Sequence, residues 1–291
     1  MAEIIQKDGT WSFDGDGVRI VPGSDKGVSL LRRTLGEVTV PLLALAGVAY
    51  EPGRRTGRLR LRLRDGADPL LQVTGGKLDD ASDPYTLTVE TKGAAIAEYF
   101  VDEVRNALLL DSVPTGPVDR YLLPGPSLPL TVSAGDGTAG FDGRTVRLEW
   151  TWHTDEVKTS SGPATIPLED LHAVEWQPSR GLVDGHLRFV SSPNAPRVPA
   201  GRDPHAVELN GFKKDPLMAL LAAAVVVRMP HPHAPEAVPV PEPKSLGPVP
   251  GAADDPDALL RRLRELGELH ASGILTDEEF SLAKQAVLKR L

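Results

Sequence analysis

The sequence lacks cysteine, which excludes a disulfide framework and thiolate chemistry. It also lacks a hydrophobic run long enough to cross a bilayer, which takes roughly 20 residues. Its most apolar stretch, residues 217–227, is shorter and is typical of a buried helix. Basic residues are not in surplus, and the net charge of -8 disfavours binding to nucleic acid. Residues 1–8 contain no basic segment followed by an apolar run, so we expect no export and a cytoplasmic protein.

One stretch of the sequence occurs twice, at residues 13–20 and 141–148. Both copies contain Phe-Asp-Gly followed by a strand pattern in which arginine alternates with apolar residues, and a Gly-Thr pair precedes each copy at equal distance. A repeat of this length predicts two copies of one domain. Glycine and proline are abundant, at 28 and 27 residues, and helical periodicity is confined to three places, so we predict a mainly β fold with some α.

The first repeat comprises residues 1–110. Short apolar runs bounded by glycine or proline predict a hairpin over residues 11–20, strands at 28–31, 38–45, 47–50 and 57–64, and a last strand ending at residue 90. A closing helix follows. Its predicted core stripe consists of Ile96, Phe100, Val104 and Leu108, with Tyr99 beside them.

Three groups of residues could form a functional site, but the spacing of each differs from that of the known motif it resembles. Asp14, Asp16 and Gly17 resemble the opening of a calcium loop, but the rest of that loop is missing and Arg144 replaces Asp16 in the second copy. Residues 75–77 lack the upstream glycine of a phosphate-binding loop. The histidines match no metal or triad signature. We therefore expect no catalytic residue, no cofactor and no metal site, and a protein that is not an enzyme.

The strongest local charge feature is an arginine face on the strand at residues 57–64. Period-two alternation places its leucines toward the core and its arginines on the opposite face. The candidate anion-binding residues are Arg54, Arg55, Arg58, Arg60, Arg62 and Arg64. They could bind a phosphorylated headgroup or an acidic peptide. The favoured interpretation is a solvated face neutralised by acidic residues of neighbouring strands, since the matching strand of the second repeat keeps only His186 and Arg188.

Residues 111–130 are rich in proline, and we predict an extended, semi-rigid connector between the repeats. The second repeat covers residues 131–229, and Asp215 and Pro216 are the predicted N-cap and first residue of its closing helix. That helix is apolar on every side, so its extra face needs a partner, most simply the first repeat and next another protein chain. For Trp150 and Trp152 we favour packing over a recognition surface.

The tail consists of a proline-rich flexible linker at residues 230–255 and a helical hairpin at residues 256–291. A capping box at residues 276–279 begins the second helix. A unit below about 40 residues rarely folds alone without a disulfide or metal, so we expect the hairpin to self-associate or dock. The candidate interaction residues are Leu259, Leu263, Leu266, Ile274, Leu275, Phe280 and Val287.

Residues 260–284, with their Leu-x-x-Leu and Gly-Ile-Leu-Thr-x-x-Glu-Phe patterns, resemble the SHOCT short C-terminal domain. That resemblance implies oligomerisation or partner recruitment. The two repeats are similar to the actinobacterial domain-of-unknown-function family 4429, on the Phe-Asp-Gly motif, a hydrophobic-Pro-Leu segment and a terminal helix. This second resemblance implies two pleckstrin-homology-like (PH-like) β-sandwich or barrel repeats, each closed by a C-terminal helix. Neither family implies catalytic residues or a ligand.

Together these features predict a non-enzymatic binding or scaffold protein whose tail mediates oligomerisation or recruitment. The expected partner is another protein or a second copy of the chain, bound through the C-terminal hairpin, and nucleic acid is not expected. Joining modules in this way would raise avidity without new contacts. The alternative, which the sequence favours less, is a membrane-surface adaptor that binds anionic headgroups through the face from Arg58 to Arg64.

Overall fold

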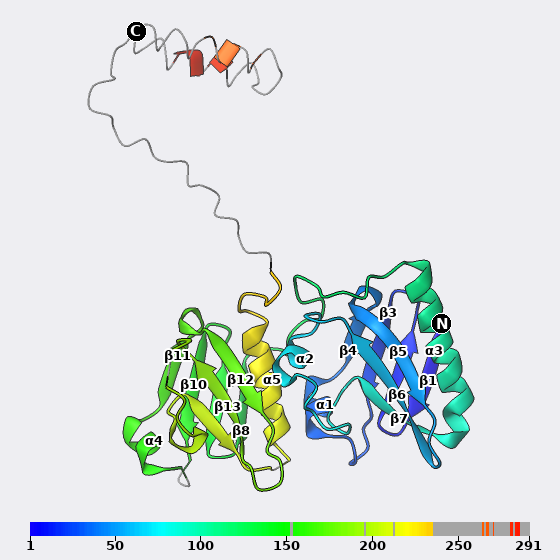
Figure 1. Ribbon diagram of the computed structural model, residues 1–291, viewed down its shortest axis with the longest axis horizontal. Helices are drawn as coiled ribbons and strands as arrows, with labels where there is room; N and C mark the ends of the chain where they lie inside the picture. Colours follow the sequence, from blue (N-terminus) through cyan, green and yellow to red (C-terminus); the bar gives the residue numbers. More distant parts are fainter. Residues whose placement is uncertain are drawn as a thin grey trace. The chain divides into compact units, whose positions relative to one another are not determined.

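The computed structural model describes residues 1–151, 154–194, 196–211 and 213–234, together with residues 264, 266, 267, 270, 280, 281 and 283–285. The chain divides into two compact units, Met1–Pro235 and Glu236–Leu291. Both repeats belong to the first unit, whose sheets and helices are labelled in Figure 1. Among the described residues, no helix combines the length and the hydropathy that a membrane span requires.

The two repeats have the same strand order, as the duplicated sequence predicts. The first contains antiparallel sheets of order β1-β2-β3-β4 and β5-β6-β7, and the second contains β8-β9-β10-β11 and β12-β13-β14. The strands are β1 (Ala2–Gln6), β2 (Gly9–Phe13), β3 (Gly17–Pro22), β4 (Val38–Pro41), β5 (Leu45–Glu51), β6 (Thr56–Leu63), β7 (Thr86–Glu90), β8 (Leu130–Ala134), β9 (Gly137–Phe141), β10 (Thr145–Trp150), β11 (Ala164–Pro167), β12 (Ala173–Gln177), β13 (Gly185–Val190) and β14 (Ala206–Leu209). Each repeat is a β-sandwich, and the described strands form no closed barrel.

The duplicated motif forms the predicted hairpin in both repeats. Trp11 pairs with Ile20 across β2 and β3, and the matching pair joins β9 and β10. Asp14 Oδ1 accepts the backbone N–H groups of Asp16 and Gly17, both at 3.0 Å. Asp142 holds the equivalent turn in the same way, and these bonds keep the pKa of both carboxyls below its usual range. The two aspartates therefore serve a turn.

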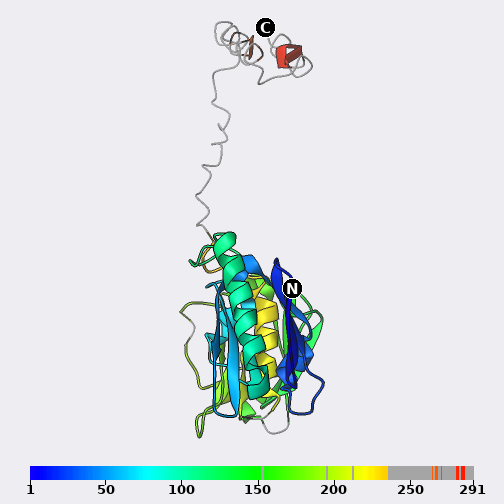
Figure 2. The ribbon, with the colours of Figure 1, turned by 90° about the vertical axis from the view of Figure 1, so that its right-hand side faces the viewer.

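Two long helices close the repeats, and both run upright in Figure 1 and in Figure 2, which is turned by 90°. The α-helices are α1 (Leu30–Leu35), α2 (Pro69–Thr74), α3 (Ala94–Leu110), α4 (Glu156–Ser161) and α5 (Asp215–Val226), and the 3-10 turns are η1 (Leu42–Ala44), η2 (Thr91–Gly93), η3 (Leu168–Asp170) and η4 (Ala200–Arg202). On α3 the buried stripe starts at Ala97 and includes Phe100, Val101 and Val104. Ile96, predicted in that stripe, is 50% exposed because it lies one position, about 100°, away from Ala97.

The predicted strand at residues 28–31 is wrong. Leu30 opens helix α1, whose N-cap Ser29 accepts the backbone N–H of Arg32 on Oγ at 3.3 Å. A serine before a short leucine-rich segment is a capping signal, and here it outweighs the β propensity of Val28. The predicted strand at residues 38–45 is interrupted by η1, so β4 and β5 are separate strands of different sheets.

The connector is part of the first repeat and not the extended tether that its prolines predicted. Val118 and Leu123 are buried in the first core. The N–H of Val118 donates to Asp65 O at 2.9 Å, and that of Leu122 donates to Ala67 O at 2.8 Å. Apolar side chains between the prolines provide enough burial to fix the segment.

Helix α5 joins the repeats. Its residues from Met218 to Val225 are all buried, and it packs on β8 and β12 of its own repeat as well as on α1 and α2 of the first (Figure 1). Leu31 of α1 and Leu70 of α2 belong to the second core. This confirms that the extra apolar face is covered by the first repeat. The helix begins at Asp215, so Lys214 and not Asp215 is its N-cap.

An ion pair ties the two sheets of the first repeat together. Asp8, which precedes the Gly-Thr pair at the start of β2, lies 3.5 Å from Nη1 of the buried Arg32 on α1. Its carboxylate also accepts the backbone N–H of Thr88 on β7, at 3.1 Å. The turn before β2, helix α1 and the last strand therefore meet at one carboxylate.

The second repeat contains the same tie with a lysine. Lys158 on α4 is 0% exposed, and its Nζ donates to Asp136 Oδ2 at 2.5 Å and to Ala206 O at 2.8 Å. Asp136 Oδ1 accepts the N–H of Glu208 on β14 at 2.8 Å. Burial, and then the charge of Asp136, raise the pKa of the Glu208 carboxyl. Both repeats thus contain an aspartate that binds a buried cation and a backbone N–H of the last strand.

The segment after α5 returns to the first repeat. His231 Nε2 lies 2.9 Å from Gly66 O, and His233 Nε2 lies 3.0 Å from Asp65 Oδ2. The ring of His231 also packs edge-on against Tyr121. Gly66 has φ of +79°, and a Cβ there would come within 2.8 Å of the His231 ring. These two histidines therefore fix the first residues of the predicted flexible linker.

The second unit is described at few positions, and all of these are helical, as predicted for the hairpin. The ring of His270 stacks on Phe280 with centroids 4.6 Å apart. Leu266 and Phe280 are partly buried. The other candidate interaction residues of the hairpin lie outside the described residues; they are Leu259, Leu263, Ile274, Leu275 and Val287.

Candidate anion-binding cleft between the repeats

The arginine face of β6 is present, and much of its charge is already engaged. The leucines of β6 are buried and the arginines point away from the core, as the alternation predicts. Arg58 and Arg60 both form ion pairs with Asp80, the latter at 2.9 Å. Asp80 lies in the loop after α2 and not on a neighbouring strand as predicted.

The remaining arginines of this face differ in their contacts. Arg62 is exposed and, among the described residues, donates only a long hydrogen bond to a backbone oxygen, at 3.4 Å. Arg64 donates to the backbone oxygens of Leu43 and Gly116 at 3.0 and 2.8 Å, which attaches the connector to the sandwich. Arg54 and Arg55, before the strand, are exposed and have no ion pair with any described residue. The face therefore contributes partly to the fold, and Arg54, Arg55 and Arg62 carry charge that no described carboxylate pairs.

A larger concentration of unengaged charge lies in a cleft between the repeats, with a volume of about 710 Å³. Four segments line it: the loop before α1 with α1 itself, the loop after α2, the turn between β12 and β13, and the start of α5. The lining residues are Lys26, Gly27, Val28, Ser29, Leu30, Arg33, Gly76, Lys77, Leu78, Asp79, Ala81, Ser82, Trp176, Pro178, Ser179, Arg180, Gly211, Lys213, Asp215 and Pro216.

Helix caps hold the first repeat's side of the cleft in place. Asp68, the N-cap of α2, accepts the N–H groups of Leu70 and Leu71 and the hydroxyl of Tyr85, the last at 2.9 Å. Burial of this carboxyl raises its pKa to about 6. Gly75 ends the helix in the left-handed region, with φ of +54°. This turn directs the chain into the loop that carries Lys77.

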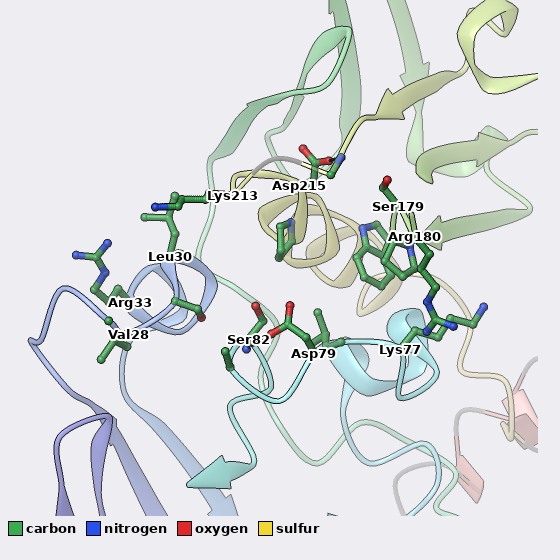
Figure 3. Close-up of a pocket in the computed structure, with 18 of the residues that line it drawn as sticks. Val28, Leu30, Arg33, Lys77, Asp79, Ser82, Ser179, Arg180, Lys213 and Asp215 are labelled. Carbon is green, nitrogen blue, oxygen red and sulfur yellow. Dashed lines mark hydrogen bonds between the residues drawn. The ribbon is translucent and has the colours of Figure 1, made fainter. Parts of the chain in front are cut away.

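Five cationic side chains line the cleft, three from the first repeat and two from the second. They are Lys26, Arg33, Lys77, Arg180 and Lys213, and all five are exposed. Figure 3 shows Arg33 and Lys213 on one side of the cleft and Lys77 and Arg180 on the other. Within the described part of the chain, none of the five has an ion-pair partner.

The two carboxylates that line the cleft are engaged by backbone donors. Asp79 Oδ1 accepts the N–H of Ser82 at 2.7 Å, and Asp215 Oδ2 accepts the N–H of Gly211 at 2.6 Å. Asp215 is also buried. The cleft therefore presents more positive than negative charge, although the whole chain is acidic.

The apolar part of the lining includes one buried aromatic residue. Trp176 on β12 is 4% exposed, and its indole Nε1 has no acceptor among the described residues. Trp150, by contrast, donates from Nε1 to Gly162 O at 2.9 Å, which confirms its packing role. Trp152 and His153 lie outside the described residues. Among the residues that the structure describes, no group of His, Asp and Glu could hold a metal ion.

Sequence reasoning did not find this cleft. Its cations are spread over four segments that span residues 26–213, and no local pattern links these segments. The one available signal was the wholly apolar α5, which predicted docking and therefore a boundary between the repeats. Clefts of this kind commonly form at such boundaries.

Comparison with protein families agrees with the duplicated architecture. The model of a domain of unknown function, DUF4429, matches residues 11–105 and again residues 139–226. The model of a short C-terminal domain, SHOCT, matches residues 261–288. No curated protein matches the chain.

Proposed function

The chain belongs to the DUF4429 family, which has no assigned function, and we propose that it is a non-enzymatic binding protein that holds an anionic ligand in the cleft between its repeats. The observation that carries this proposal is the set of five exposed cations, drawn from both repeats, that have no ion-pair partner among the described residues. Five cations that converge beside only two carboxylates repel each other, and a bound anion relieves that repulsion.

The surroundings of the cations support this assignment. A concave site lined by one sign of charge concentrates the field and attracts oppositely charged ligands. Arginine supplies paired donors that match phosphate and carboxylate oxygens, and lysine supplies a mobile point charge. The cleft contains both kinds, in Arg33 and Arg180 and in the three lysines.

The test is calorimetric titration of the full chain with tripolyphosphate. Replacing Lys77 and Arg180 together by glutamate is expected to weaken binding by at least about tenfold, because one cation from each repeat becomes an anion. The wild-type affinity should also fall as salt is raised.

The matched control is the double variant Arg54→Glu and Arg55→Glu, which makes the same charge change at exposed positions outside the cleft. Its affinity should equal that of the wild type. If this control loses binding and the cleft variant keeps it, the site lies at Arg54 and Arg55 and not in the cleft, and the proposal is wrong.

The tail supplies the second part of the proposed function, self-association or recruitment through the SHOCT-like hairpin. Deleting residues 236–291 leaves the first compact unit whole, with its two anchoring histidines. We expect light scattering to report a multiple of the chain mass for the full protein and a monomer for the truncated one. An unchanged number of subunits would exclude self-association through the tail.

A further inference from the structure

We infer that the ligand of the cleft is a phosphorylated small molecule that carries an aromatic ring, and not a bare anion. This inference rests on the proposed function and specifies the class of ligand. Three features of the cleft support it: its size, its apolar lining and the buried indole N–H of Trp176.

The size of the cleft fits a small molecule. Sites for drug-sized ligands and cofactors have volumes of about 300–1,000 Å³, and this cleft has about 710 Å³. An inorganic phosphate or pyrophosphate would fill a small part of it. The cations lie on both sides of the cleft, as Figure 3 shows for four of them. The phosphate end of a ligand can therefore bind cationic side chains while the rest of the ligand occupies the centre of the cleft.

The apolar lining favours a ligand with an apolar part. Its partly exposed apolar residues are Leu30 and Leu78 from the first repeat and Pro178 and Pro216 from the second. Contact with a flat ring would remove such surface from water, and this gain is not available to a bare polyanion.

The indole of Trp176 supplies the independent observation. The residue borders the cleft, and its Nε1 is a buried donor without an acceptor among the described residues. Buried donors are normally paired, because an unpaired one lowers the stability of the fold. The N–H is covered in the free protein, so an acceptor on the ligand would reach it only after the indole moves toward the cleft, and this pairing would then add to ligand affinity.

The experiment compares probes that share three phosphates but differ in the ring. The full chain is titrated with tripolyphosphate and with the four nucleoside triphosphates ATP, GTP, CTP and UTP. At least one nucleotide should bind about tenfold more tightly than tripolyphosphate, as burial of a ring predicts. If none does, while tripolyphosphate binds, the inference is wrong and the proposed function stands. If none of the five probes binds, both are wrong.

A substitution tests the role of the indole. Trp176→Phe keeps an aromatic ring and removes the N–H, and it should weaken nucleotide binding by about fivefold without lowering the thermal midpoint. Trp150→Phe is the matched control, because its N–H is already paired inside the second repeat. That variant should lose stability and keep its affinity. An unchanged affinity in Trp176→Phe would remove the indole from the site.

Phosphate can also be presented by a lipid, and a second arm separates the two sources. Vesicles of neutral phosphatidylcholine with and without anionic phosphatidylserine are sedimented with the wild type and with the Lys77→Glu, Arg180→Glu variant. We expect phosphatidylserine to cause no sedimentation of the wild type that is lost when Lys77 and Arg180 are replaced. Such dependence would assign the cleft to a membrane surface and overturn the inference.

Discussion

Replacing Lys158 by alanine is expected to lower the free energy of unfolding by about 3–5 kcal/mol, the usual cost of removing one partner of a buried ion pair. Lys158 is 0% exposed and donates to Asp136 and to Ala206 O. Its Nζ also lies 4.7 Å from the centre of the Trp150 ring. Alanine would leave the Asp136 charge buried without a cation. Urea denaturation followed by circular dichroism measures the loss.

Arg202→Ala is the control for this change. Arg202 forms an ion pair with Asp155 in the same repeat at 3.4 Å, but its side chain is 66% exposed. Water screens a pair of this kind, so its removal should have a much smaller effect than the loss of Lys158. Equal effects in the two variants would mean that the tie between the sheets contributes no more than a surface contact.

The second large effect is expected from Gly135→Ala. Gly135 has φ of +58° in the turn between β8 and β9, and a Cβ there would lie 1.6 Å from the backbone oxygen of Glu208. The backbone must shift, which also disturbs the bonds between Asp136 and Glu208. We expect a loss of more than about 4 kcal/mol, in the range where a single substitution removes a specific structural feature. Differential scanning calorimetry would measure it.

Gly75→Ala separates strain from crowding. Gly75 has almost the same φ, +54°, but no atom lies within 4 Å of the position of a Cβ. Only the left-handed backbone opposes alanine there, at a cost of about 1–2 kcal/mol. If both variants lose the same stability, the contact with Glu208 O contributes nothing to the loss in Gly135→Ala.

Local patterns in the sequence predicted most of the fold, because the features that define it are local. Period-two alternation placed the leucines of β6 in the core, and the Asp-Gly turns placed the hairpins. Errors arose where two local signals competed, as at residues 28–31, where the cap at Ser29 outweighed a short apolar run. The proline-rich connector was also misread, because its anchoring oxygens on Asp65 and Ala67 lie far away in the sequence.

The candidate site could not be predicted in this way. The sequence places Arg58 and Arg60 on one face, but the partner that neutralises them, Asp80, becomes visible only in the folded chain. The opposite holds for Lys77 and Arg180, which have no neighbouring cation in the sequence but line one cleft in the structure. Charge in the sequence therefore pointed to a surface whose arginines are partly paired in the fold, since pairing depends on tertiary contacts.

The contact of α5 with α1 and α2 joins two different faces, one from each repeat. In principle such a head-to-tail contact could continue, with a third copy added to the second. The face that would receive it is altered, because α4, the counterpart of α1, has the sequence Glu-Val-Lys-Thr-Ser-Ser where α1 has Leu-Leu-Arg-Arg-Thr-Leu. The polar surface of α4 therefore offers a third helix little of the apolar contact that α5 finds on α1.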